Sequence, residues 1–218
     1  MNAAPPVRRL ALADGPTLAH RAYGPAGGAP LLFVPGVASG SLMRVGEELL
    51  DGRGLRLLSV GRPGLGSSDA DTGKTLASVG DDLHRLAATL GGPVPVVANS
   101  QGAPFALAVT AVFGDKGFRA LLRAALDDGF RQGPDGYARD TVLAMLPWGF
   151  DLDALDVPVT VLFGADDTSH SPDLGATLAA RIPTAERIVV PGVGGSLLWA
   201  RPELVLDAAL GKPLLPMA

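Results

Sequence analysis

The sequence predicts an α/β protein with a doubly wound, mostly parallel sheet, and two patterns support this fold class. Short, continuously apolar runs, as in 30–34 and 55–60, are typical of strands buried on both faces. These runs alternate with segments whose apolar residues recur at helical spacing, which supplies the crossovers that parallel strands need. With 218 residues the chain is long enough for one substantial core, so we expect a single domain over 1–218.

The first two strands are predicted to form an antiparallel hairpin at the amino-terminal edge of the sheet. Apolar and polar residues alternate in 9–12 and again in 17–23, and Asp14-Gly15 between them favours a tight turn. The apolar runs predict further strands at 30–34, 55–60, 94–98, 158–163 and 187–190. Helical spacing, caps and breakers predict helices over 41–50, 75–90, 103–108, 172–182 and 202–210.

The stretch 115–150 interrupts this alternation. Two helix faces are traced there, the first by Phe118, Leu121, Leu122, Ala125 and Leu126 and the second by Tyr137, Val142, Leu143 and Leu146. No strand is evident between the helix that follows residue 100 and the apolar run at 158–163. We therefore expect 115–150 to form a short helical lid inserted into the domain.

Composition and charge exclude several classes of function. The net charge is −4, and no run of Lys or Arg forms the basic stripe that attracts nucleic acids or anionic membranes. The chain has no cysteine, so disulfides, thiol nucleophiles and cysteine-ligated zinc are excluded. Its first residues lack the apolar core of a signal peptide, and no apolar run approaches the roughly 20 residues of a membrane span. We expect a cytoplasmic protein whose partner is a small molecule, with no nucleic acid and no membrane involved.

No cofactor or metal ion is expected. The three histidines are scattered along the chain, so no metal site is evident. The glycines of 61–66 follow a strand, but no helix starts at once and no ribose-binding acid follows the next strand, which argues against a dinucleotide site. The triplet 73–75 lacks the earlier glycine of a phosphate loop, because Ser68 stands in its place.

A serine stands at the junction between a predicted strand and a predicted helix. Residues 94–102 run Val-Pro-Val-Val-Ala-Asn-Ser-Gln-Gly, and helix-forming residues follow at once. The hydroxyl of Ser100 is thereby placed at the carboxyl edge of the sheet and at the positive end of a helix. The alternative is that this serine is only an N-cap, which is a common role.

Four segments in order make the chain resemble the α/β-hydrolase-fold superfamily over nearly its full length. They are the Pro35-Gly36-Val37 turn, the glycine-rich loop 61–69, the elbow-like segment 98–102 and the strand end 164–167. The loop 61–69 resembles the Asp-Arg-Pro-Gly-x-Gly-x-Ser loop of the superfamily, with glycine for the aspartate, and 98–102 resembles its Gly-x-Ser-x-Gly nucleophile elbow.

The resemblance implies roles for individual residues. It assigns the nucleophile to Ser100 and the oxyanion-hole donors to the backbone N–H groups of Val37 and Gln101. It assigns the orienting acid to Asp167, with Asp166 as the other possibility. Either carboxylate could instead only cap the helix that is predicted to start near residue 172.

The chain departs from the superfamily at the catalytic base. The usual histidine follows the last strand in a Gly-x-Gly-His setting, and Gly195 stands where that histidine is expected. Without an imidazole, the serine hydroxyl keeps a pKa far above neutrality. His20 and His84 lie in a predicted edge strand and a predicted helix, whereas His170 lies on the loop that carries the acid. His170 is therefore our candidate base, and the alternative is that it only hydrogen-bonds its own loop.

A second departure concerns the sheet. The superfamily normally has another parallel strand after the elbow helix, and here either the sheet is one strand shorter or 109–113 leaves the helix to supply it. A shortened sheet would expose an apolar edge and favour a homodimer.

The sequence thus supports two functional hypotheses. The first is a serine hydrolase that acts on a small ester, thioester or amide through an acyl-enzyme on Ser100. The second is a non-hydrolytic or catalytically impaired protein of the same fold that binds a small apolar ligand or shapes an intermediate. Apolar lining from Phe130, Trp148, Phe150 and Trp199 would favour an acyl or polyketide-like ligand, and the alternative is that each of them packs in the core or the lid.

Overall fold

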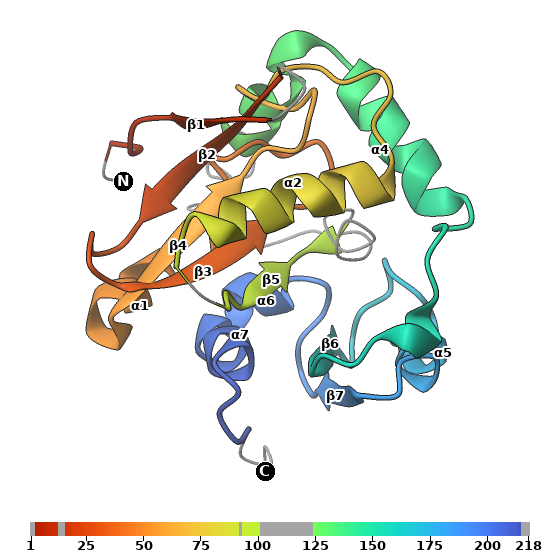
Figure 1. Ribbon diagram of the computed structural model, residues 1–218. Coiled ribbons are helices and arrows are strands. Elements are labelled where there is room, and N and C mark those ends of the chain that lie inside the picture. Colours follow the sequence, from red (N-terminus) through yellow and green to blue (C-terminus); the bar gives the residue numbers. More distant parts are fainter. Residues whose placement is uncertain (1–2, 13–15, 92, 101–123, 215–218) are drawn as a thin grey trace.

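The computed structural model describes residues 3–12, 16–91, 93–100 and 124–214 (Figure 1). Five strands form one sheet in the order β1-β2-β4-β3-β5, and two more strands, β6 and β7, pair separately. Their bounds are β1 (Arg8–Ala11), β2 (Thr17–Tyr23), β3 (Ala29–Val34), β4 (Leu55–Val60), β5 (Val96–Ala98), β6 (Val159–Gly164) and β7 (Ala185–Val190). The predicted amino-terminal hairpin is confirmed, because β1 pairs with β2 in antiparallel register at the edge of the sheet.

The parallel part of the structure consists of two groups of strands. In the first, β3 lies between β4 and β5 and runs parallel to both. In the second, β6 and β7 run parallel to each other. Among the described residues no strand pairs with both β5 and β6. The alternative in which 109–113 supplies the joining strand lies outside the described residues.

Apolar side chains of the central strands point to both faces, which explains their continuous apolar runs. In β3, Leu31 and Phe33 enter one core cluster and Leu32 enters another. The first cluster includes residues of α1 (Glu47–Arg53), α6 (Leu197–Ala200) and α7 (Pro202–Ala209), and the second includes residues of α2 (Leu76–Ala88). Figure 1 shows α2 on one side of the sheet and α7 on the other. The predicted doubly wound arrangement is confirmed.

Two predicted helices begin later than expected, and glycine conformation explains both. The helix predicted over 41–50 begins only at Glu47, because Gly46 before it has φ 59° in the left-handed region. The helix predicted over 172–182 is α5 (Ala176–Ala180), which begins after Gly175 with φ 78°. A left-handed residue cannot continue a right-handed helix, so each glycine fixes the start. The helix predicted over 75–90 is closer to expectation, since Thr75 and Ser78 form a capping box at the start of α2.

The described part of the lid stretch, 124–150, contains helical segments, while Phe118, Leu121 and Leu122 of the first predicted helix lie outside the described residues. Residues 124–129 are helical, and they are followed by η2 (Phe130–Gln132), α4 (Asp135–Met145) and η3 (Leu152–Ala154). The apolar face predicted for the second helix is largely exposed, since Val142 and Leu146 both lie more than half in solvent at 54% and 55%. The side chain that α4 buries is the charged Asp140.

The described helices give no membrane-spanning candidate. None of them combines the length with the apolar character that a bilayer crossing requires.

Candidate active site

Ser100 has the backbone conformation that a nucleophile elbow requires. Its φ is 58°, in the left-handed region that non-glycine residues rarely adopt. Such strain persists only where the surrounding structure enforces it, and it is concentrated at functional sites. Ser100 follows β5 directly, and it is 4% exposed. Its Oγ is buried and has no hydrogen-bond partner among the described residues.

The Pro35-Gly36-Val37 turn packs directly on this serine. A Cβ placed on Gly36 would lie 2.8 Å from the Ser100 Cβ and 3.1 Å from its Oγ. The Val37 N–H, assigned as an oxyanion donor, meets no backbone acceptor within the described part of the chain. The second assigned donor, Gln101, lies outside the described residues. The structure therefore brings one of the two assigned oxyanion segments into contact with Ser100.

Replacing Gly36 with alanine is expected to slow chemistry at Ser100 while leaving the fold intact. The added methyl group would overlap the side chains of Ser100 and Asn99, since an atom of each would lie 2.8 Å from the new Cβ. A displacement of the nucleophile by about 1 Å can cost about 100-fold in rate. The measurement is the rate at which a fluorophosphonate labels Ser100, with thermal unfolding as the check on folding. The matched control is Gly27→Ala, because a Cβ at Gly27 meets nothing within 4 Å. Equal labelling rates in the two variants would contradict this placement of the turn.

Asp167 and His170 form a pair on the loop that follows β6. The His170 Nδ1 lies within hydrogen-bond distance of the Asp167 Oδ2, and both side chains are buried, at 9% and 3% exposed respectively. Because an ionised carboxylate only accepts hydrogen bonds, Nδ1 carries a proton, which leaves Nε2 as the ring atom that can act as a base. The ring also packs edge-on against Phe163 of β6, with centroids 6.2 Å apart.

The environment of Asp167 keeps its carboxylate ionised. Burial raises the pKa of Asp167, but hydrogen bonds from Ser169 and His170 outweigh burial and hold the pKa below its ordinary value. The Oδ1 atom accepts the Ser169 N–H at 2.9 Å and the His170 N–H at 3.2 Å. The simpler contact foreseen for His170, within its own loop, is thus present together with the imidazole–carboxylate pair.

Asp166 does not share the contacts of Asp167, and neither carboxylate caps α5. Asp166 is exposed, and its backbone N–H donates to the Val193 carbonyl at 3.0 Å. The residue that caps the start of α5 is Asp173, which accepts the Thr177 N–H at 2.8 Å and the Gly175 N–H at 3.0 Å. Capping by Asp166 or Asp167 is therefore not what the structure shows.

The turn that contains Gly195 lies against the acid loop. A Cβ on Gly164 would lie 2.1 Å from the Val193 carbonyl oxygen, and one on Gly194 would lie 3.4 Å from the Asp166 carbonyl oxygen. The position that holds the histidine in the superfamily is therefore adjacent to the loop of Asp167. Gly195 itself does not adopt a positive φ, so its backbone conformation is open to other residues.

The three candidate catalytic side chains are not joined into one network. Asp167 and His170 are paired, but no hydrogen bond joins His170 to Ser100 among the described residues. His20 lies in β2 with its pKa lowered by burial, and Arg8 and Arg56 lower it further. His84 lies in α2. No cluster of His, Asp and Glu side chains that could hold a metal ion occurs in the described part of the chain.

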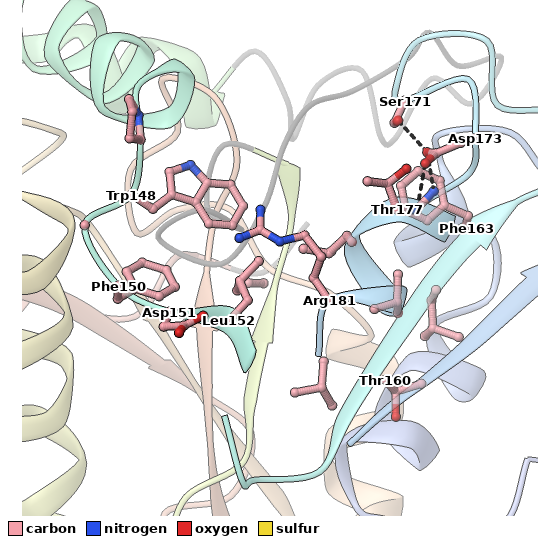
Figure 2. Close-up of a pocket in the computed structure, with 18 of the residues that line it drawn as sticks. Trp148, Phe150, Asp151, Leu152, Thr160, Phe163, Ser171, Asp173, Thr177 and Arg181 are labelled. Carbon is pink, nitrogen blue, oxygen red and sulfur yellow. Dashed lines mark hydrogen bonds between the residues drawn. The ribbon is translucent and has the colours of Figure 1, made fainter. Parts of the chain in front are cut away.

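A cavity of about 880 Å³ opens beside the elbow. Its described lining includes Ala98 of β5, all of β6 up to Phe163, the linker 146–152 and part of α5. Figure 2 shows Trp148 and Phe150 on the linker side, with the Arg181 side chain extending across the cavity toward Trp148. The apolar lining expected from Trp148 and Phe150 is confirmed.

The other two aromatic residues expected in the lining lie elsewhere. Phe130 packs edge-on against Tyr137, with centroids 5.6 Å apart. The indole N–H of Trp199 donates to the Arg44 carbonyl at 3.0 Å, and its ring packs on the main core. Neither is among the described residues that line the cavity. The sequence identifies aromatic residues but does not say which of them line a given cavity.

One set of buried charges near the site was not predicted from the sequence. Arg62, Lys74 and Asp140 are all almost completely buried, and Asp140 forms an ion pair with each of the two cations. Arg62 belongs to the glycine-rich loop 61–69, which the sequence singled out, but nothing in the chain indicated that Asp140 would reach it. Pairing of charges that are distant in sequence is a tertiary property.

Solved structures give the fold. A hydrolase of E-2-(acetamidomethylene)succinate superposes with a TM-score of 0.70 at 22% identity, over 94% of this chain and 97% of that one. The chain has the α/β-hydrolase fold. An esterase from Rhodococcus sp. gives a TM-score of 0.64 at 20% identity, over 94% and 98% of the two chains. A thioesterase domain from the curacin biosynthetic pathway gives 0.63 at 17% identity, over 96% and 100%.

At these identities, the likeness extends to the fold and not to a particular activity. No family model and no curated protein sequence matches the chain. Within the α/β-hydrolase fold, the strand order and the junction after β5 place Ser100 at the carboxyl edge of the sheet, where ligands of open α/β sheets bind.

Proposed function

We propose that the protein is a serine hydrolase that acylates Ser100 with a small ester, thioester or amide. The observation that carries this proposal is the conformation of Ser100, which combines a left-handed φ of 58° with a buried, unpartnered hydroxyl among the described residues. The left-handed φ is the strained strand-to-helix conformation of a nucleophile elbow, whereas a helix-capping residue ordinarily has an extended backbone.

The Asp167–His170 pair supplies the base in this proposal. Nε2 of His170 takes the proton from the Ser100 Oγ as that oxygen attacks the carbonyl carbon of the substrate. The negative charge that develops on the carbonyl oxygen is stabilised by the N–H groups of Val37 and Gln101. His170 then returns the proton to the leaving group, which departs. In the second half of the reaction His170 takes a proton from water, the water oxygen attacks the acyl carbon, and the Ser100 oxygen leaves with the proton that His170 returns.

This mechanism requires the loop 168–171 to approach Ser100 when substrate binds. Catalytic hydrogen bonds often form only in the substrate complex, and the bond between His170 Nε2 and Ser100 Oγ belongs to that stage of the mechanism. The cavity beside the elbow, walled by Trp148 and Phe150, favours an acyl group of apolar character.

The second candidate function is ligand binding without a covalent step. The observation that favours it is Gly195, which leaves the usual position of the base without an imidazole. In that case, the cavity binds a small apolar ligand and the strained serine takes no part in chemistry.

Fluorophosphonate labelling distinguishes the two functions. We expect wild-type protein to gain one covalent adduct by intact mass and to hydrolyse p-nitrophenyl acetate, and we expect Ser100→Ala to do neither. The matched control is Ser41→Ala, because Ser41 Oγ is also buried and unpartnered among the described residues, while its φ is not positive. Background hydrolysis that is unchanged in Ser100→Ala would exclude the hydrolase.

A further inference from the structure

Three buried charged side chains lie behind the turn that contacts Ser100. The side chains of Arg62 and Asp140 are 0% exposed, and that of Lys74 is 1% exposed. The Arg62 Nε donates to Asp140 Oδ2 at 2.7 Å, and the Lys74 Nζ lies 2.6 Å from Asp140 Oδ1. Burying charges is costly unless each is paired and hydrogen-bonded, so such a cluster needs a reason to exist.

The other end of Arg62 holds the oxyanion turn. Its Nη1 donates to the Pro35 carbonyl, and its Nη2 donates to the Gly36 carbonyl at 3.1 Å. The Gly36 carbonyl belongs to the same peptide unit as the Val37 N–H, the assigned oxyanion donor. A charged donor on the oxygen of a peptide unit fixes the orientation of that unit and polarises its N–H.

We propose that Arg62 is a positioning residue that acts on the substrate oxyanion through the Gly36–Val37 peptide, and that Asp140 of α4 holds Arg62 in place. This inference rests on the proposed hydrolase function. Arg62 touches neither substrate nor the reacting atoms, so its contribution is to the geometry and the donor strength of Val37 N–H.

Asp140 connects Arg62 and the turn that Arg62 contacts to the lid stretch, because Asp140 belongs to α4. The first turn of α4 sits on the glycine-rich loop, since a Cβ on Gly136 would lie 2.3 Å from the Gly64 carbonyl oxygen. Lys74 joins the same surfaces, with its Nζ donating to the Pro63 carbonyl at 2.6 Å and to the Gly136 carbonyl at 3.4 Å. A shift of α4 would therefore move the Asp140 carboxylate relative to Arg62 and disturb the turn.

The charges of the cluster make Asp140 indispensable to it. Asp140 is the carboxylate that both buried cations contact, so its loss leaves two like charges buried together. Burial lowers the pKa of Lys74, and Asp140 opposes that shift. Neutralising Asp140 therefore allows Arg62 to leave the carbonyls of Pro35 and Gly36.

The test compares Asp140→Asn and Arg62→Lys with the matched control Asp207→Asn. Asp207 is also a carboxylate between an arginine and a lysine, Arg53 and Lys212, but it joins α7 to α1. We expect kcat for p-nitrophenyl acetate to fall about tenfold in the first two variants with KM changed by less than about twofold, and both constants to hold in the control. We also expect the Val37 amide proton resonance to move upfield in both variants, because the carbonyl of its peptide loses a charged donor.

Each outcome decides the proposal. Folded variants with unchanged kcat and an unmoved Val37 resonance would overturn it, as would a Val37 shift of equal size in Asp207→Asn. If Asp140→Asn does not fold by circular dichroism, Arg62→Lys alone carries the test, since it keeps the buried charge and removes the two-pronged donation. If wild-type protein shows no activity that depends on Ser100, the proposed function fails, while the Val37 resonance still reports whether Arg62 and Asp140 hold the turn.

Discussion

Replacing His170 with alanine is expected to lower kcat/KM for p-nitrophenyl acetate by roughly 10²–10⁴-fold, the usual contribution of a general base. The physical reason is that His170 is the imidazole that the structure pairs with Asp167, whose lowered pKa keeps it ionised. Without the ring, the hydroxyl of Ser100 must lose its proton to water. The measurement is steady-state hydrolysis together with the rate of fluorophosphonate labelling.

His84→Ala is the matched control for His170→Ala. It removes an imidazole from α2, outside the candidate site, so both rates should match those of the wild type. Labelling of Ser100 at the same rate in His170→Ala and in wild type would remove His170 from the mechanism. A fall in labelling without loss of thermal stability would assign it the role of base.

Introducing histidine at Gly195 in the His170→Ala background is expected to restore about 10²–10⁴-fold in kcat/KM, by supplying a base from the position that the superfamily uses. The turn 191–195 lies against the acid loop, and Gly195 does not have a positive φ, so its backbone conformation does not require glycine. In this background, the Oδ2 of Asp167 is also free to accept from the new ring, because its present donor is His170.

The control for the Gly195 variant is Gly195→Gln in the same background. Glutamine fills a similar volume but cannot accept a proton at neutral pH, so it should not restore activity. Introduced alone, with His170 still present, Gly195→His should give a smaller change, since the two rings then compete for Asp167. No gain in the double variant would show that the vacated position does not reach both Ser100 and Asp167.

Local patterns in the chain predicted most of the strands and named the segments of the candidate site. Continuous apolar runs identified the strands, because strands covered on both faces cannot alternate with polar residues. The order of the turn at Pro35, the elbow at Ser100 and the acid loop at Asp167 predicted which segments meet at the carboxyl edge of the sheet. The left-handed φ of Ser100 agrees with this prediction.

The strand pairing and the first residues of two helices depend on features that only the folded chain has. In the described part of the chain, the pairing of β6 with β7 depends on hydrogen bonds between segments that are far apart in the sequence. The starts of α1 and α5 depend on the φ that Gly46 and Gly175 adopt, and sequence alone does not distinguish a left-handed glycine from a helical one.

In the candidate site too, some features could be named from the sequence and others appear only in the structure. The types of residue at Ser100, Asp167 and His170 indicated the chemistry in advance, because nucleophile, acid and base are properties of side chains. The burial of Arg62 with Asp140 could not be foreseen, because the cost of burying a charge is met only by a partner that folding brings to it. The candidate residues could therefore be named from the chain, while the contacts of Arg62 behind the Pro35-Gly36-Val37 turn depend on the packing of α4 against the glycine-rich loop.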